Sequence, residues 1–107
     1  MDIFQAIADP TRRQIIEQLS SYHAAKFGLS IKELTHDSGI SRQAMTKHLN
    51  TLIKTGAVAA EFQGKEKRHF LKHYAFSDAW QWLEPIAKQW DGKLQNLKHH
   101  LNNEDKA

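Results

Sequence analysis

The fold of this chain is decided by residues 38–55, which read SGISRQAMTKHLNTLIKT. Gly39 permits the left-handed backbone of a tight turn, and Ser41 is a good N-cap for a helix that follows it. The apolar side chains of that helix recur at spacings of 4, 3 and 1, at Met45, Leu49, Leu52 and Ile53. This spacing places them on one face, so we expect an amphipathic helix that ends at Gly56.

The opposite face of this helix is polar and basic. Before the turn, Ser30 and Glu33 match a capping box, which predicts a short helix over residues 31–37. Two helices joined by a glycine-containing turn are typical of a helix-turn-helix, which places its second helix in the DNA major groove. We therefore expect the DNA-recognition face to consist of Ser41, Arg42, Gln43, Thr46, Lys47, Asn50 and Lys54.

A β-hairpin is predicted directly after this helix. Residues 57–62 alternate enough for a strand, residues 63–66 suit a turn, and residues 67–74 form the return strand. A helix-turn-helix followed by a hairpin with a basic tip is a winged helix. From that tip, the wing, we expect contacts to phosphates or to the minor groove from Lys65, Lys67 and Arg68, with a plain solvated turn as the alternative.

The first thirty residues are predicted to be helical. Asp2 and Asp9 are candidate N-caps, and Pro10 suits the first position of a helix that runs on through residues 24–25 and stops at Gly28. Two arginines, Arg12 and Arg13, lie at the end of this helix that disfavours positive charge. We expect them to have an acidic or phosphate partner, or to form a solvated pair.

The last predicted helix spans residues 78–102, with Ser77 as its N-cap. Pro85 lies inside it and predicts either a kink near residues 81–85 or a fresh helix that begins at Pro85. Apolar residues at spacings of 3, 4, 4, 3 and 4 form a seam of coiled-coil type, at Leu83, Ile86, Trp90, Leu94, Leu97 and Leu101. We expect this seam, with Ile3 and Phe4 near the N-terminus, to be a dimer interface, with intramolecular packing as the alternative.

Length and composition favour one domain over residues 1–107. The elements described above make it mainly helical with a small hairpin, a winged helix-turn-helix in the order α-α-α-α-β-β-α. We expect it to dimerise through its terminal helices. Residues 41–73 hold seven Lys and Arg but two Asp and Glu, a net charge of +5, whereas the whole chain carries +3. This uneven charge indicates a surface for a polyanion. Because no signal peptide or membrane-spanning stretch is apparent, we expect a cytoplasmic protein that does not contact membranes.

Over nearly its whole length the chain resembles the arsenic-repressor (ArsR) family of winged-helix transcriptional regulators. The matching stretches are residues 8–16 (ADPTRRQII), residues 39–49 (GISRQAMTKHL) with Leu52 and residues 56–58, and residues 64–67 (GKEK). The resemblance implies a homodimer that binds an inverted-repeat operator in double-stranded DNA and represses transcription. It also implies that Arg42, Gln43, Thr46 and Lys47 read the DNA and that residues 65–68 form the wing.

The metal sites of many ArsR relatives are not matched here. Their Cys-x-Cys pair falls on Ser30 and Lys32, and the Asp-x-His pair falls on Asp91 and Lys93. We therefore expect no metal ion and no other cofactor. Without a metal ion as the signal, we expect derepression to be caused by a small molecule, by a partner protein or by simple dilution. Residues 20–29, longer than in the family, are expected to alter the dimer edge or hold a ligand.

Two other classes of function compete with a repressor. A winged domain that binds an acidic protein is the alternative, but the polar composition of the recognition face argues against it, because protein-binding faces favour aromatic anchors. An enzyme is not expected: the sequence shows no nucleophile motif, no phosphate-binding glycine loop and no histidine–carboxylate cluster at a useful spacing.

Overall fold

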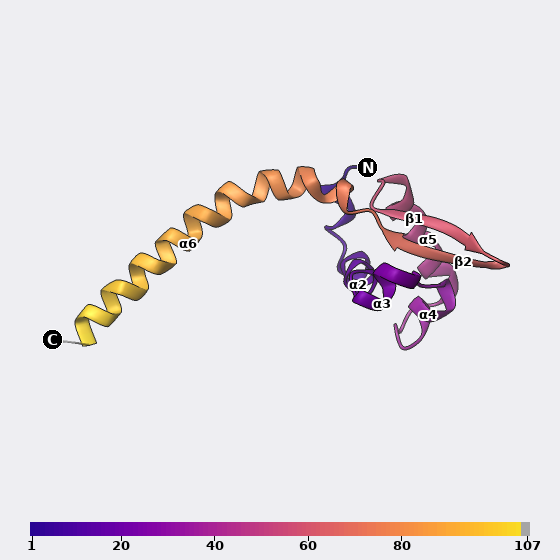
Figure 1. Cartoon of the computed structure of the whole chain (residues 1–107), viewed down its shortest axis with the longest axis horizontal. Helices are drawn as coiled ribbons and strands as arrows, with labels where there is room; N and C mark the ends of the chain where they lie inside the picture. The colour runs from indigo at the N-terminus through magenta and orange to yellow at the C-terminus, as the bar shows by residue number, and fades with distance from the viewer. Residues whose placement is uncertain (106–107) are drawn as a thin grey trace. The chain divides into compact units, whose positions relative to one another are not determined.

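The structure, a computed structural model, describes the backbone of residues 1–105 and the side chains of residues 1–93, 95, 96, 99 and 100. It divides into a packed unit, Met1–Phe76, and a second unit that begins at Ser77. The elements, drawn in Figure 1, are α1 (Ile3–Ala6), α2 (Pro10–Leu19), α3 (Tyr22–Phe27), α4 (Ile31–Thr35), α5 (Arg42–Lys54), β1 (Val58–Gln63), β2 (Glu66–Leu71), the 3-10 helix η1 (His73–Phe76) and α6 (Ser77–Asp105). The mainly helical, winged helix-turn-helix class with one antiparallel hairpin is confirmed.

One helix was not predicted. The expected continuation of α2 through residues 24–25 is wrong, because α2 ends at Leu19 and α3 begins afresh after Ser21, whose side chain accepts a hydrogen bond from the Ala24 N–H at 3.1 Å. The predicted stop at Gly28 is confirmed: its φ is 68°, and a Cβ there would lie 2.7 Å from Cζ of Phe70. The order before the hairpin is therefore five helices, not four.

The helix starts predicted from local capping are confirmed. Asp2 caps α1, Asp9 caps α2 with Pro10 at its first turn, and Ser30 and Glu33 form both bonds of the capping box of α4. Ser41 caps α5 by accepting from the Ala44 N–H at 3.1 Å. These bonds satisfy N–H groups that a helix leaves unpaired at its start, which is why they fix the boundaries.

The two arginines of α2 have a partner that was not expected. Arg12 donates to the carbonyl oxygens of Ala6 (2.7 Å) and Gln5 (3.1 Å), and Arg13 donates to those of Ile7 (2.9 Å) and Ala8 (3.2 Å). They therefore cap the C-terminal end of α1, where the helix dipole favours positive charge. Arg12 also lies near the Asp9 carboxylate, whose pKa is lowered mainly by the hydrogen bond from the Arg12 backbone N–H and further by the Arg12 charge.

The core of the Met1–Phe76 unit lies between α2, α4, α5 and the base of the hairpin. The predicted apolar stripe of α5 faces it: Met45, Leu49 and Leu52 are buried, and Ile53 is half-buried. Side chains from three other elements complete it, at Ile15, Leu19, Leu34 and Val58. Burying one face of α5 in this way leaves its opposite face at the surface.

The hairpin is shorter on its return strand than predicted. Val58 pairs with Leu71 and Gln63 pairs with Glu66, which leaves Gly64 and Lys65 as a two-residue turn. Gly64 has φ 65°, as the first position of a type II′ turn requires. The expected strand over residues 72–74 is wrong, because the chain enters η1 at His73.

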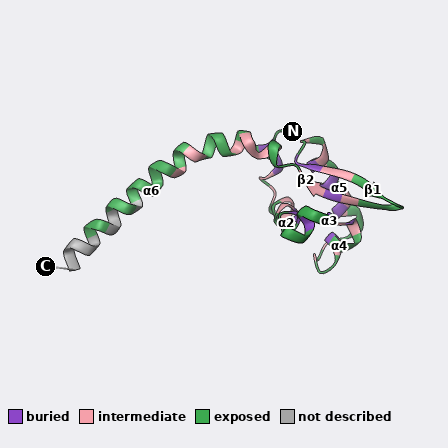
Figure 2. Ribbon diagram, in the orientation of Figure 1, coloured by how far each residue is buried: buried purple, intermediate pink, exposed green. Residues whose placement is uncertain are grey.

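The last helix is continuous through Pro85 in the structure (Figure 1), so the predicted fresh start at Pro85 is wrong. It begins at Ser77, which is its first residue and not its cap, and it extends beyond the predicted end at residue 102. None of its described side chains is buried (Figure 2). Of the predicted seam, the side chains of Leu94, Leu97 and Leu101 lie outside the described residues.

Candidate nucleic-acid interface

The predicted recognition face lies on the side of α5 away from the core. Six of its residues are exposed, and the seventh, Thr46, is half-buried and donates its hydroxyl to the Arg42 carbonyl at 2.8 Å. Four of the residues share one helical stripe because they follow spacings of 4, 3 and 4, at Gln43, Lys47, Asn50 and Lys54. Hydrogen-bonding and cationic side chains are thus presented together on one rigid helix.

The wing presents two further cations. Lys65 lies in the two-residue turn, and Lys67 lies on β2, opposite Phe62. Every residue from Glu61 to Lys67 is exposed. The outer half of the hairpin therefore projects without packing against the core, and both ammonium groups are accessible to a polyanion.

Arg68, expected to contact DNA with these lysines, is engaged elsewhere. Its Nε donates to the Phe27 carbonyl at 2.6 Å, and its Nη2 donates to the Gly28 carbonyl at 3.1 Å. The same guanidinium pairs with Glu33 at 2.9 Å and Glu66 at 3.0 Å, and the side chain is 14% exposed. In the structure Arg68 therefore ties β2 to the chain between α3 and α4.

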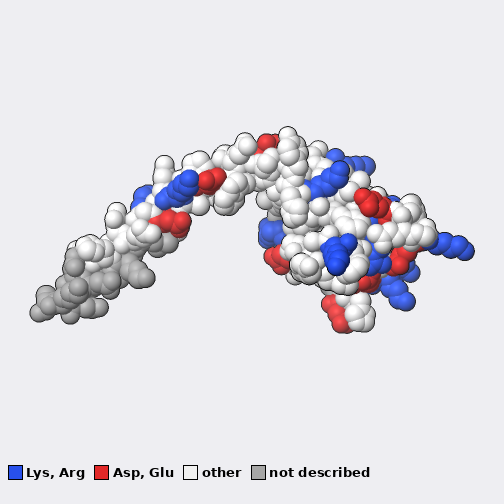
Figure 3. Space-filling model, in the orientation of Figure 1, with Lys and Arg blue, Asp and Glu red and all other residues white. Residues whose placement is uncertain are grey.

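The start of α5 and the wing line the same cavity, although more than twenty residues separate them in sequence. This cavity has a volume of about 310 Å³. Four cations surround it, Lys32, Arg42, Lys65 and Lys67, with Ser30, Ile31 and Glu66 completing its wall. Figure 3 shows Lys and Arg side chains at the hairpin end of the Met1–Phe76 unit, with Asp and Glu side chains between them, and further Lys and Arg side chains elsewhere on the unit.

Lys32 is the member of this cluster that sequence reasoning missed. Its place beside Arg42 and the wing depends on how α4 packs against α5 and β2, which no local pattern indicates. The uneven charge of residues 41–73 pointed to the surface but not to this residue.

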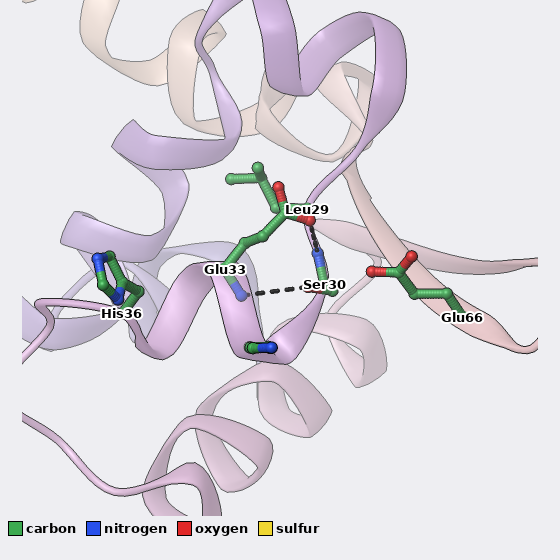
Figure 4. Close-up of a pocket in the computed structure, with 6 residues that line it drawn as sticks. Leu29, Ser30, Glu33, His36 and Glu66 are labelled. Atoms are coloured by element: carbon green, nitrogen blue, oxygen red, sulfur yellow. Dashed lines mark hydrogen bonds between the residues drawn. The ribbon is translucent and has the colours of Figure 1, made fainter.

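A second cavity, of about 580 Å³ (Figure 4), shares Ser30, Lys32 and Glu66 with the first. Its lining mixes apolar, acidic and basic groups, at Leu29, Ser30, Lys32, Glu33, His36 and Glu66. Burial raises the pKa of the Glu33 carboxyl, but the hydrogen bonds from Ser30 and the charge of Arg68 lower it by more, to below its usual value. Among the residues that the structure describes, no three His, Asp or Glu side chains are grouped to hold a metal ion.

Beside Arg68, His69 of β2 is 1% exposed. Its Nδ1 donates to the Leu29 carbonyl at 2.9 Å, and the two residues also exchange backbone hydrogen bonds, from Leu29 N at 3.0 Å and from His69 N at 2.8 Å. Burial lowers the pKa of His69 below its usual 6.5; the bond to Leu29 opposes this change, and the nearby Lys67 adds to it. His69 is therefore buried in its neutral form.

Acidification is expected to destabilise the protein through His69. Its folded pKa is lowered, so below about pH 6.5 the unfolded chain binds a proton before the folded chain does. Stability is then full above that pH and falls as the pH is lowered, by at most about 1.4 kcal/mol per pH unit for one group. Urea unfolding at several pH values measures this loss.

His69→Gln is expected to reduce the loss of stability between about pH 7 and pH 5.5, because glutamine does not titrate there. His36→Gln is the matched control, since the His36 ring is 80% exposed beside Asp37. An unchanged pH dependence in His69→Gln, or an equal change in the control, contradicts the assignment.

Comparisons with known proteins agree with the winged helix-turn-helix fold. No protein-family model matches the chain. The chain is 40% identical to an uncharacterized HTH-type transcriptional regulator, YuzN, of Bacillus subtilis. The match spans 65 residues, which are 59% of this chain and 71% of YuzN. It is 24% identical to the transcriptional repressor SdpR of the same species, over 93 residues that are 87% of this chain and 98% of SdpR.

A solved structure is similar as well. An ArsR-like transcriptional regulator from Rhodococcus sp. RHA1 superimposes with a TM-score of 0.64 at 31% identity, over 91% of this chain and 87% of that one. No helix of the described residues is long and apolar enough to cross a membrane. From its winged fold and from these relatives, the chain belongs to the ArsR family of helix-turn-helix transcriptional regulators.

Proposed function

We propose that this regulator is a homodimeric repressor that acts in the cytoplasm and binds an inverted-repeat operator in double-stranded DNA. The observation that carries the proposal is the cavity that joins Arg42, at the start of α5, to Lys65 and Lys67 of the wing. Recognition helix and wing thus present one cationic surface, as binding to a continuous duplex requires.

Within this surface the side chains divide into two roles. Gln43 is suited to an adenine edge and Arg42 to a guanine edge in the major groove, because each can form two hydrogen bonds to that base. The lysines supply contacts to phosphates, which carry no sequence information. They are Lys47 and Lys54 on α5, Lys65 and Lys67 on the wing, and Lys32 on α4. Ser41, Thr46 and Asn50 complete the face.

A second copy of the chain is proposed to cover the apolar seam of α6. The described part of the seam is open in the single chain: Leu83 and Ile86 are each 46% exposed and Trp90 is 60% exposed. Their spacing continues into Leu94, Leu97 and Leu101, which is the repeat of two helices packed side by side. Of the two N-terminal residues assigned to this interface, Phe4 retains surface for a partner, whereas Ile3 is buried.

The protein-interaction module is not favoured by any observation on the Met1–Phe76 unit. The candidate surface of that unit is cationic and polar. If the alternative were right, this surface would bind an acidic protein, and the chain would show no sequence-specific binding of DNA. No catalytic role is proposed, since the relatives are named as transcriptional regulators. The signal that relieves repression, whether a small molecule, a partner protein or dilution, is left open.

Gln43→Ala is expected to relax the preference for one base pair in each half-site, by about 1–3 kcal/mol, and to leave the salt dependence of binding unchanged. The measurement is selection of bound duplexes from a random library, followed by titration of the selected duplex at several salt concentrations. Gln14→Ala, at an exposed glutamine of α2, is the matched control. A variant that keeps every base preference contradicts the role of Gln43.

A further inference from the structure

The two wing lysines lie on a part of the hairpin that has no packing of its own. Residues from Glu61 to Lys67 are all exposed, and the first residue of β2 toward the core that is not exposed is Arg68. We propose that Arg68 is a positioning residue, which sets the wing relative to α4 and α5 so that both can contact one duplex. This inference rests on the proposed DNA-binding function.

Each nitrogen of the Arg68 guanidinium has a partner. Nε and Nη2 donate to the carbonyls of Phe27 and Gly28, at the end of α3, while Nη2 also contacts Glu33 and Nη1 contacts Glu66. Guanidinium is planar and presents its donors in a fixed fork, so these bonds determine its orientation as well as its place. Glu66 lies on the same strand as Arg68. The other three partners are distant in sequence, with separations of 35 residues for Glu33, 40 for Gly28 and 41 for Phe27.

Glu33 passes this restraint on to the helix-turn-helix. Its Oε1 accepts both from Arg68 and from the Ser30 N–H at 3.1 Å, and its own N–H donates to the Ser30 hydroxyl at 3.1 Å. The carboxylate that caps α4 is therefore also the anchor of β2. Because α4 carries Lys32, this bond fixes one wall of the cationic cavity relative to the wing.

The same contacts adjust the charge of the surface. Glu66 lies between Lys65 and Lys67 in sequence, where a free carboxylate would repel phosphate. Its pairing with Arg68 at 3.0 Å holds the Glu66 carboxylate toward the guanidinium and offsets part of that charge. The two carbonyls come from Phe27 and Gly28, within residues 20–29, so this segment serves as the anchor of the wing.

The first test needs no DNA. The chain contains no cysteine, so Lys65→Cys provides a single site for a spin label at the tip of the wing. Adding Arg68→Gln is expected to increase the mobility of this label in the free protein, while a label at Gln14→Cys on α2 stays unchanged. Equal mobility at the wing tip with and without Arg68→Gln overturns the inference, whatever the protein binds.

The second test uses the duplex that the wild-type protein selects from a random library. Arg68→Gln is expected to weaken binding about tenfold, within the range for coupled residues, and to flatten the salt slope, because the lysines of a displaced wing lose phosphate contacts. Arg68→Lys is expected to weaken binding similarly, because an ammonium keeps the charge but not the fork. A slope that falls by about one per subunit in Arg68→Gln and is restored in Arg68→Lys would identify a phosphate contact and overturn the inference.

A double-mutant cycle separates positioning from a general effect on stability. In a protein that carries Lys65→Ala and Lys67→Ala, Arg68→Gln is expected to cost much less affinity than in the wild type, because the wing it positions no longer contributes. In a Gln43→Ala background its cost is expected to be unchanged. Equal costs in both backgrounds contradict a role that acts through the wing.

Where Arg68→Gln does not fold, Glu33→Gln is tested in the same cycle, since it retains the two carbonyl contacts of Arg68. It is expected to show the same pattern with a smaller loss, and full additivity with the wing substitutions contradicts the inference. A wild-type protein that selects no duplex removes the proposed function, and the label mobility then decides the inference alone.

Discussion

Replacing Leu83 and Ile86 together with glutamate is expected to convert the dimer into a monomer and to weaken operator binding by about 10²- to 10⁴-fold. Both side chains lie on the proposed seam of α6 and are nearly half exposed in the single chain. Two charges on that seam would be buried against the partner without compensation, so association is lost. A monomer then binds one half-site at a time and loses the gain of linked binding. Light scattering gives the mass, and titration of the selected duplex gives the affinity.

The matched control adds two charges to the same helix outside the seam. Gln81→Glu and Gln95→Glu lie on the opposite face at 100° per residue, and both positions are exposed. This variant is expected to remain a dimer, with affinity lowered only by the added negative charge. If the control dissociates as readily as the seam variant, the interface is not on the predicted face. If neither dissociates, α6 is not the dimerisation element.

Removal of the two wing lysines is expected to have the second large effect. Lys65→Ala with Lys67→Ala takes four cations from the DNA-binding surface of the dimer, and the slope of log affinity against log salt should flatten by about 3 to 4. All sequences are expected to be weakened alike, because phosphate contacts do not read bases. The measurement is titration of one selected duplex and one unrelated duplex at several salt concentrations.

Lys26→Ala with Lys72→Ala removes the same number of charges from outside the proposed surface and is the control for this experiment. Its salt slope is expected to stay close to that of the wild type. A variant lacking the wing lysines that loses base preference but keeps its slope would reverse the roles proposed for α5 and the wing.

Local signals accounted for most of the helix boundaries. Asp2, Asp9, Ser30 and Ser41 could be identified as caps because a cap bonds to N–H groups two or three residues away. The periodicity of α5 likewise fixed which face is buried. The start of α3 had such a signal at Ser21, but the alanines that follow favour helix, and the break between Leu19 and Tyr22 was missed.

The site was only partly accessible from sequence because charge alone does not reveal partners. Lys65, Lys67 and Arg68 look equivalent along the chain, yet Arg68 contacts groups that are up to 41 residues away. Lys32 joins the surface only through the packing of α4. Arg12 and Arg13 bond to carbonyls of the preceding helix, a partner that neither acidic nor phosphate chemistry predicts.

Selection of bound sequences from a random duplex library by the wild-type protein tests the central claim most directly. A homodimer with its recognition helices one duplex turn apart should enrich one inverted repeat, with half-site centres separated by about 10 base pairs or a multiple of a turn. Enrichment of a single half-site would contradict the dimer. Weak binding with no enriched sequence would contradict sequence-specific repression and favour a protein partner for the cationic surface.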